Sequence, residues 1–191
     1  DLVNWSDEML INLSGGKLGC LWAPGIFFDE NSGNYIVHWS SSCKDDNYSG
    51  LSIYYSCTKD FEIFTEPKLF FRKKDSDSCI VKENDVYHFF VKSADTPKVV
   101  IHETSNDLFG PYKRDEAFDE QMKALPLKEK YEAPTVFRLN DGKLCLLMDF
   151  YGCDRREEQG YVPFVTNSLE NIRLDAAKDK FYFPYGFKHG V

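Results

Sequence analysis

Apolar and aromatic residues along the chain fall in short runs that alternate with clusters of turn-forming residues. The runs cover 25–28, 35–39, 51–56, 87–92, 99–103, 135–139 and 144–150. Runs of this length, rich in aromatic and β-branched side chains, predict β-strands. The pair Asp141-Gly142 between two of them indicates a hairpin turn. The pattern therefore predicts an all-β chain.

One segment departs from the strand pattern. Residues 115–130 place Phe118, Met122 and Leu125 at helical spacing. Pro126 interrupts the pattern, since proline cannot continue a helix. We expect one short helix in this segment.

The predicted strands recur as a unit. Each unit opens with a short apolar strand, continues with an aromatic strand and a third strand, and ends on a polar segment such as 58–64, 105–112 or 167–172. The opening strands contain Ile26, Ile80 and Val136, which are 54 and 56 residues apart. A period of about 50 residues with four strands per unit is typical of β-propeller blades. The alternative is an ordinary antiparallel sandwich with coincidental spacing.

The repeat divides a single domain, 1–191, into blades at about 20–72, 76–114 and 131–175. Residues 1–5 match the end of a blade, and 186–191 match the start of another. Three blades do not close a ring, because propellers have about four to eight. We therefore expect a segment of a longer propeller, or a ring completed by self-association with another chain.

The net charge of the chain argues against nucleic acid and anionic membranes as partners. Lys and Arg number 23 and Asp and Glu number 31, which gives a net charge of −8. Such a chain lacks the positive field that nucleic acid or an anionic membrane attracts. The longest purely apolar run, 144–148, is far shorter than the roughly 20 residues of a membrane-spanning helix. We expect neither nucleic acid nor a membrane as a partner.

The six cysteines form no C-x-x-C pair, which argues against a zinc site or a thioredoxin-like motif. Several lie in strand-like runs, where cysteine behaves as a small apolar residue. We expect reduced, buried thiols and a cytoplasmic location, with secretion as the alternative if a leader peptide has been removed.

Acidic side chains are the candidates for catalysis. The nucleophile elbow, the phosphate-binding loop, the dinucleotide fingerprint and H-E-x-x-H are absent, and the histidines show no ligand spacing. Asp77 and Glu132 each precede an apolar strand that opens a predicted blade, and such first strands line the axis of a propeller. Each could be a solvated loop acid. Their equivalent positions in two blades favour one shared pocket, because an acid facing the axis is costly unless it is used or paired.

Six short segments carry a family resemblance. In order they are Asp1-Leu2-Val3-Asn4-Trp5, Leu21-Trp22-Ala23-Pro24, Asp77, Leu108-Phe109-Gly110-Pro111-Tyr112, Glu132-Ala133-Pro134 and Lys188-His189-Gly190. Together they resemble glycoside hydrolase family 43, which contains β-xylosidases, α-L-arabinofuranosidases and arabinanases. The resemblance implies a five-bladed β-propeller that hydrolyses pentose-containing plant polysaccharides or oligosaccharides with inversion.

The resemblance also implies roles for the acids. Glu132 matches the general acid, and Asp77 matches the aspartate that raises the pKa of that acid and orients it. The family's general base lies on the first strand of the first blade, ahead of the motif that 1–5 match. The chain therefore offers no matched base, and Asp1 lies at the wrong end of a blade to serve.

Other positions bear on the substrate. Trp22 is expected to form an apolar platform under a sugar or to pack between blades, and Asp149 to reach a sugar hydroxyl. His189 matches an axial histidine that in many members holds a hydrated cation or a water, so a Ca ion is conceivable there, although no cofactor is required. Gly25 replaces an acid found in many members, and Lys188 replaces an arginine.

Three residues, His38, Trp39 and Lys92, follow the inner strands and could line the cleft, although packing roles are favoured for them. Two alternative functions stay open. One is a non-catalytic carbohydrate-binding propeller that has lost its base. The other is a retaining, fructan-cleaving propeller glycosidase, in which the nucleophile and the acid stand about 5–5.5 Å apart.

Overall fold

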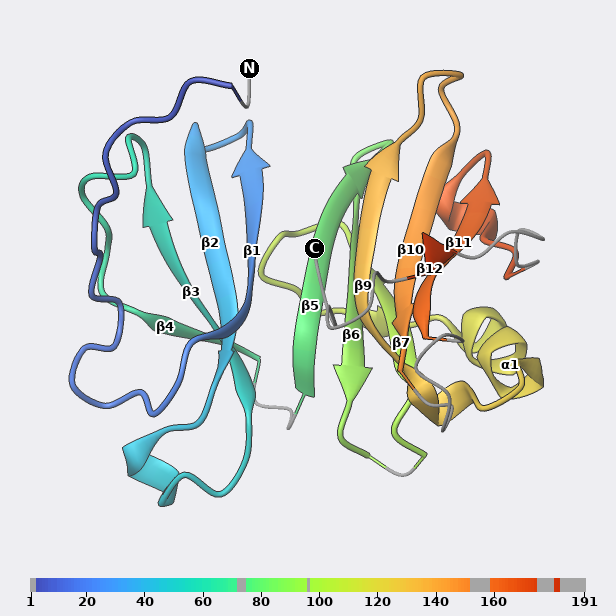
Figure 1. Ribbon diagram of the computed structural model, residues 1–191, viewed down its shortest axis with the longest axis horizontal. Helices are drawn as coiled ribbons and strands as arrows, with labels where there is room; N and C mark the ends of the chain where they lie inside the picture. Colours follow the sequence, from blue (N-terminus) through green and yellow to red (C-terminus); the bar gives the residue numbers. More distant parts are fainter. Residues whose placement is uncertain (1–2, 72–74, 96, 152–158, 175–180, 183–191) are drawn as a thin grey trace.

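Three four-stranded antiparallel sheets, formed one after another along the chain, make up the fold (Figure 1). The computed structural model describes residues 3–71, 75–95, 97–151, 159–174 and 181–182. The first sheet contains β1 (Trp22–Asp29), β2 (Asn34–Ser41), β3 (Ser52–Thr58) and β4 (Lys68–Phe71). The second contains β5 (Asp75–Glu83), β6 (Val86–Ser93), β7 (Val100–Ser105) and β8 (Lys113–Arg114). The third contains β9 (Tyr131–Arg138), β10 (Leu144–Phe150), β11 (Gly160–Thr166) and β12 (Phe181–Tyr182). The prediction of an all-β chain is confirmed.

The polar segments that end each repeat are turns that lead into the fourth strand. In the first sheet the Asp60 carboxylate accepts the backbone N–H groups of Glu62 and Ile63, at 2.9 and 3.0 Å. In the second sheet the Asp107 carboxylate accepts the N–H of Phe109 at 2.8 Å. Side chains that accept nearby N–H groups stabilise turns. The fourth strands β4, β8 and β12 begin after these segments.

The predicted helix is α1 (Glu116–Ala124), followed by the short 3₁₀ helix η2 (Lys128–Lys130). Asp115 caps the N-terminus of α1, since its carboxylate accepts the N–H of Phe118 at 3.0 Å. Phe118 and Met122, four residues apart on one face, are fully buried. The helix packs against β7 of the second sheet.

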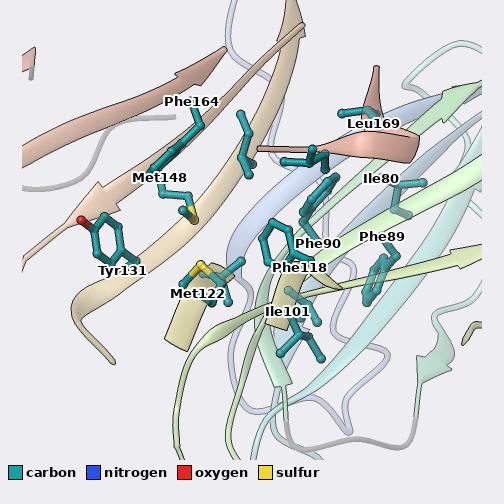
Figure 2. Packing of buried hydrophobic residues seen from close by; sticks show 14 of the residues in the cluster. Ile80, Phe89, Phe90, Ile101, Phe118, Met122, Tyr131, Met148, Phe164 and Leu169 are labelled. Carbon is teal, nitrogen blue, oxygen red and sulfur yellow. The ribbon is translucent and has the colours of Figure 1, made fainter. Parts of the chain in front are cut away.

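The hydrophobic core joins the second and third sheets (Figure 2). It combines side chains from both sheets with those of the helix: Ile80, Phe89, Phe90, Ile101, Phe118, Met122, Tyr131, Met148, Phe164 and Leu169. The second sheet is central, since β5 contacts both β1 and β9. The first strands of consecutive sheets therefore run beside one another, as Figure 1 shows for β5 and β9.

Large apolar side chains on the two outer sheets lie in solvent. Trp22, Ile26 and Phe28 alternate along β1 and are exposed, and so are Phe137 and Val165 of the third sheet. The described cysteines Cys20, Cys43, Cys57, Cys79 and Cys145 are free thiols. Within the described residues, α1 and the other helices are too short or too polar to cross a bilayer.

Candidate active site

The first strand of each sheet carries the same irregularity at the same place. The pairing register shifts between Trp22 and Gly25 on β1, and between Ser76 and Cys79 on β5. On β9 it shifts between Glu132 and Thr135, which pair with Asp149 and Leu147 of β10. Bulges of this kind redirect side chains and are frequent beside active sites.

A non-glycine residue with a left-handed backbone lies inside each bulge. These residues are Ala23, Asp77 and Ala133, with φ of 47°, 54° and 46°. L-amino acids other than glycine adopt this conformation at a cost, and such strained positions cluster at functional sites. By this register Asp77 is equivalent to Ala23 and Ala133, whereas Glu132 is equivalent to Trp22 and Ser76. The two acids therefore lie on neighbouring first strands but one position apart, which corrects the expectation that they occupy equivalent positions.

The bulge register also defines equivalent residues on the second strands. Ser40 of β2 pairs with Trp22, Lys92 of β6 pairs with Ser76, and Asp149 of β10 pairs with Glu132. These three partner positions differ in chemistry: one hydroxyl, one ammonium and one carboxyl group.

Asp77 is half-buried and is anchored to the first sheet. Its backbone N–H donates to the Ser40 hydroxyl at 3.0 Å. The next residue, Ser78, has its hydroxyl 2.8 Å from Nδ1 of the buried His38. Two side chains of β2 therefore fix the bulge of β5.

Glu132 is also half-buried, and it is brought into the same electrostatic environment as Asp77. The charges of Glu132 and Asp77 both favour the protonated form of Lys92 and so act to raise its pKa. Burial is the largest cause of the raised pKa of Tyr151, and the next causes are the charges of Glu132, Asp77 and Asp149. The charges of both predicted acids therefore act on Lys92 and on Tyr151.

Lys92 is buried, as the packing role expected of it requires. It is 7% exposed, and its ammonium group donates to the backbone oxygens of Glu129 and Tyr131 at 2.7 and 2.6 Å. Burial lowers its pKa to about 8. Tyr151 was not singled out from the sequence. Its position two residues after Asp149, directly beyond β10, is the signal that could have found it.

The other predicted substrate-binding residues differ in accessibility. The Trp22 side chain is 61% exposed, so it does not pack between sheets in this structure. Asp149 is fully buried and presents no exposed surface to a sugar. His189 and the Lys188-His189-Gly190 motif lie outside the described residues, as does Asp1.

The structure explains why glycine replaces an acid at position 25. A Cβ atom added to Gly25 would lie 2.6 Å from Nε2 of His38, which is closer than van der Waals contact permits. The buried imidazole of His38 therefore occupies the space of a side chain at position 25.

Within the described part of the chain, no group of three or more His, Cys, Asp or Glu side chains is arranged to hold a metal ion. The expected axial histidine, His189, is outside that part of the chain.

Comparisons with known proteins place the chain among glycosidases. A family model described as "Probable glycosyl hydrolase domain", related to glycoside hydrolase family 43, matches residues 1–191. No curated protein matches the sequence.

Solved structures share the fold at low sequence identity. The catalytic domain of a GH62 α-L-arabinofuranosidase from Coprinopsis cinerea is 13% identical with a TM-score of 0.56, over 78% of this chain and 48% of that one. An endo-1,4-β-xylanase from Bacteroides thetaiotaomicron is 12% identical with a TM-score of 0.57, over 85% and 55%. A GH43 protein from Bacillus licheniformis is 14% identical with a TM-score of 0.54, over 87% and 36%.

The match thus spans about half or less of the length of these three proteins, whereas the family model spans the whole of this chain. The four-stranded antiparallel sheets and the family model agree. The chain belongs to the glycosyl hydrolase family related to glycoside hydrolase family 43.

Proposed function

We propose that this chain is part of the catalytic domain of an inverting glycosidase, in which Glu132 is the general acid and Asp77 keeps Glu132 protonated. One observation carries the proposal. Asp77 and Glu132 lie at the bulges of two neighbouring first strands, β5 and β9, and Lys92 of the second sheet bonds the backbone oxygen of Tyr131, the residue before Glu132, at 2.6 Å. Paired carboxyl groups at one axis are the arrangement that glycoside hydrolysis uses.

The chemistry follows from the charges. A general acid must hold its proton near neutral pH, and a neighbouring carboxylate raises its pKa because two like charges resist ionising together. Protonated Glu132 then donates to the departing glycosidic oxygen while a water attacks the opposite face of the sugar. In an inverting enzyme the base stands about 6.5–9.5 Å from the acid to leave room for that water. The proposal places the base on a further first strand at the same axis.

A five-bladed ring is the architecture that the proposal requires. Exposed apolar side chains on both outer sheets support it, because contiguous apolar surface usually marks a contact. Ile26 and Phe28 of β1 are 61% and 47% exposed, and Phe137 and Val165 of the third sheet are 43% and 41% exposed. Further sheets packed on these two faces would bury them.

Pentose-containing glycans are the proposed substrates. The structural neighbours include an α-L-arabinofuranosidase and an endo-1,4-β-xylanase, which supports this class. The exposed indole of Trp22, beside the bulge of β1, offers an apolar surface for a sugar face.

A second candidate is a sugar-binding propeller without catalysis. The specific observation in its favour is the ammonium group of Lys92, because a nearby positive charge opposes protonation of Glu132. In that case the aromatic platform would bind oligosaccharides that are then released unchanged.

Replacement of Glu132 by Gln in the complete protein tests the catalytic proposal. We expect cleavage of xylo- or arabino-oligosaccharides to be lost and cleavage of activated aryl glycosides to persist, since only poor leaving groups need the proton. Glu62→Gln, the same change at an exposed acid in the turn before β4, is the matched control and should retain both activities. Cleavage of both substrates by Glu132→Gln at the wild-type rate would show that Glu132 is not the general acid.

Two further measurements separate the alternatives. Anomeric NMR of the first product distinguishes inversion from retention. Calorimetric binding of oligosaccharide with no product formed would favour the binding propeller.

A further inference from the structure

The position of Lys92 is fixed by the backbone that carries Glu132. Its ammonium group donates to the Glu129 oxygen at 2.7 Å and to the Tyr131 oxygen at 2.6 Å. The Tyr151 hydroxyl donates to the same Glu129 oxygen at 3.2 Å, and the Lys92 nitrogen lies 5.5 Å from the centroid of the Tyr151 ring. A side chain of the second sheet thus clamps the residue immediately before Glu132 in the third sheet.

The charges around Lys92 come from several elements. Glu132 of β9, Asp77 of β5 and Glu129 of η2 favour its ammonium form, in decreasing order, and Lys130 of η2 opposes it. Asp149 of β10 joins Glu132 and Asp77 around the neighbouring Tyr151 ring. These acids do not offset burial, so Lys92 has a pKa of about 8. Lys92 is therefore still mostly protonated at neutral pH.

Electrostatic coupling between two titrating groups is reciprocal. If the Glu132 carboxylate stabilises the Lys92 ammonium, then the ammonium stabilises the carboxylate by the same free energy. Asp77 acts on Glu132 in the opposite direction, since it carries the same charge. Glu132 therefore lies between one group that promotes its protonation and one that opposes it.

We propose that Lys92 is a positioning residue that controls the protonation of Glu132: its ammonium group fixes the segment bearing Glu132 and stabilises the charged form of that side chain. The inference rests on the proposed function for its catalytic meaning. The equivalent positions in the other two sheets hold Ser40 and Asp149, so among these three positions the cation belongs to the second sheet alone. Loss of the Lys92 charge releases Glu132 to hold its proton to higher pH.

Carbon-13 NMR of the glutamate carboxyl groups tests this in the complete protein, with the Glu132 signal assigned by its loss in Glu132→Gln. Lys92→Met keeps the length of the side chain and removes its charge, and we expect it to raise the pKa of Glu132 by about one unit or more. Lys92→Arg keeps the charge and should leave that pKa nearly unchanged. Lys98→Met removes the same charge from an exposed site on the loop beyond β6 and should also have no effect.

An unchanged Glu132 titration in folded Lys92→Met would overturn the proposal. If that variant does not fold, the wild-type protein still decides. The Glu132 signal must then show a second step at the pH where the Lys92 side chain titrates, and a single independent step overturns the coupling.

Activity supplies a separate readout. The alkaline limb of oligosaccharide cleavage should move to higher pH in Lys92→Met, by the same shift as the Glu132 titration, and stay in place in Lys92→Arg. Normal cleavage by Glu132→Gln would instead sink the proposed function while leaving the NMR coupling between Lys92 and Glu132 intact. The two failures are therefore distinguishable.

Discussion

The backbone N–H of Asp77 donates to the hydroxyl of Ser40 across 3.0 Å, so a residue of the first sheet holds an acid of the second sheet in place. Ser40 is fully buried. Replacing it with alanine leaves the part-buried N–H of Asp77 without this acceptor, which costs up to about 1–3 kcal/mol. We expect Ser40→Ala to lower the free energy of unfolding in urea by that amount. Ser49→Ala, at an exposed position of the loop after β2, should be nearly neutral. Equal stability of the two variants would contradict the role of Ser40.

The His38 ring occupies the space that a side chain at position 25 would need. A Cβ at position 25 would lie 2.6 Å from His38 Nε2, so Gly25→Ala forces the ring or the strand to move. Overpacking of this kind costs about 1–3 kcal/mol. A double-mutant cycle with His38→Ala measures the clash directly, because the alanine at position 25 should cost much less once the ring is gone. Additive losses would mean that the two residues do not compete.

Stability should fall in acid because two buried histidines resist protonation. Burial lowers the pKa of His38 and of His88 to about 4, and the neighbouring His102 adds to the effect at His88. The unfolded chain takes up both protons near pH 6.5. Between about pH 6.5 and 4 the unfolded state therefore binds more protons, and the free energy of unfolding falls as the pH drops, by up to about 3 kcal/mol per histidine. Urea unfolding at several pH values measures this slope.

The variant His88→Phe measures how much of this pH dependence of the free energy of unfolding comes from His88. The substitution keeps an aromatic ring parallel to His102 but removes the titrating group. The loss of stability between pH 6.5 and 4 should shrink by roughly half in this variant. The hydrogen bond from His102 lowers the pKa of the Asp115 carboxyl group, so the contribution of Asp115 is lost mainly below the ordinary carboxyl pKa of about 4 and affects only the acidic end of this range. An unchanged slope would remove His88 as a cause.

Trp22 and Trp39 are expected to have different roles, Trp22 in sugar binding and Trp39 in packing of the core. Trp22 is 61% exposed and Trp39 is 1% exposed. We expect Trp22→Ala to weaken oligosaccharide affinity while changing the free energy of unfolding by less than about 1 kcal/mol. Trp39→Ala should destabilise the fold by about 3–5 kcal/mol, because it empties a core site. Calorimetry with a xylo-oligosaccharide and urea unfolding of both variants measure the two effects, and unchanged affinity in Trp22→Ala would exclude the platform.

Local pattern was enough to predict the strands and the helix. The aromatic runs around Trp39 and Phe90 became β2 and β6, and the helical spacing of Phe118 and Met122 became α1. The starts of the fourth strands were not predictable in the same way. Strands such as Lys113–Arg114 are two residues long, and their pairing depends on where a preceding turn returns the chain.

The sequence by itself determined the type of element, the repeat and the two acids, because hydrophobic period, turn residues and short motifs are local properties. Only the tertiary structure decided which groups surround those acids. The bulges at Ala23, Asp77 and Ala133 set where the first-strand side chains point, and backbone register then brought Lys92 to the carbonyl beside Glu132. Electrostatic coupling depends on distance through space and on burial, and residues 40 positions apart acquire both only when the sheets pack.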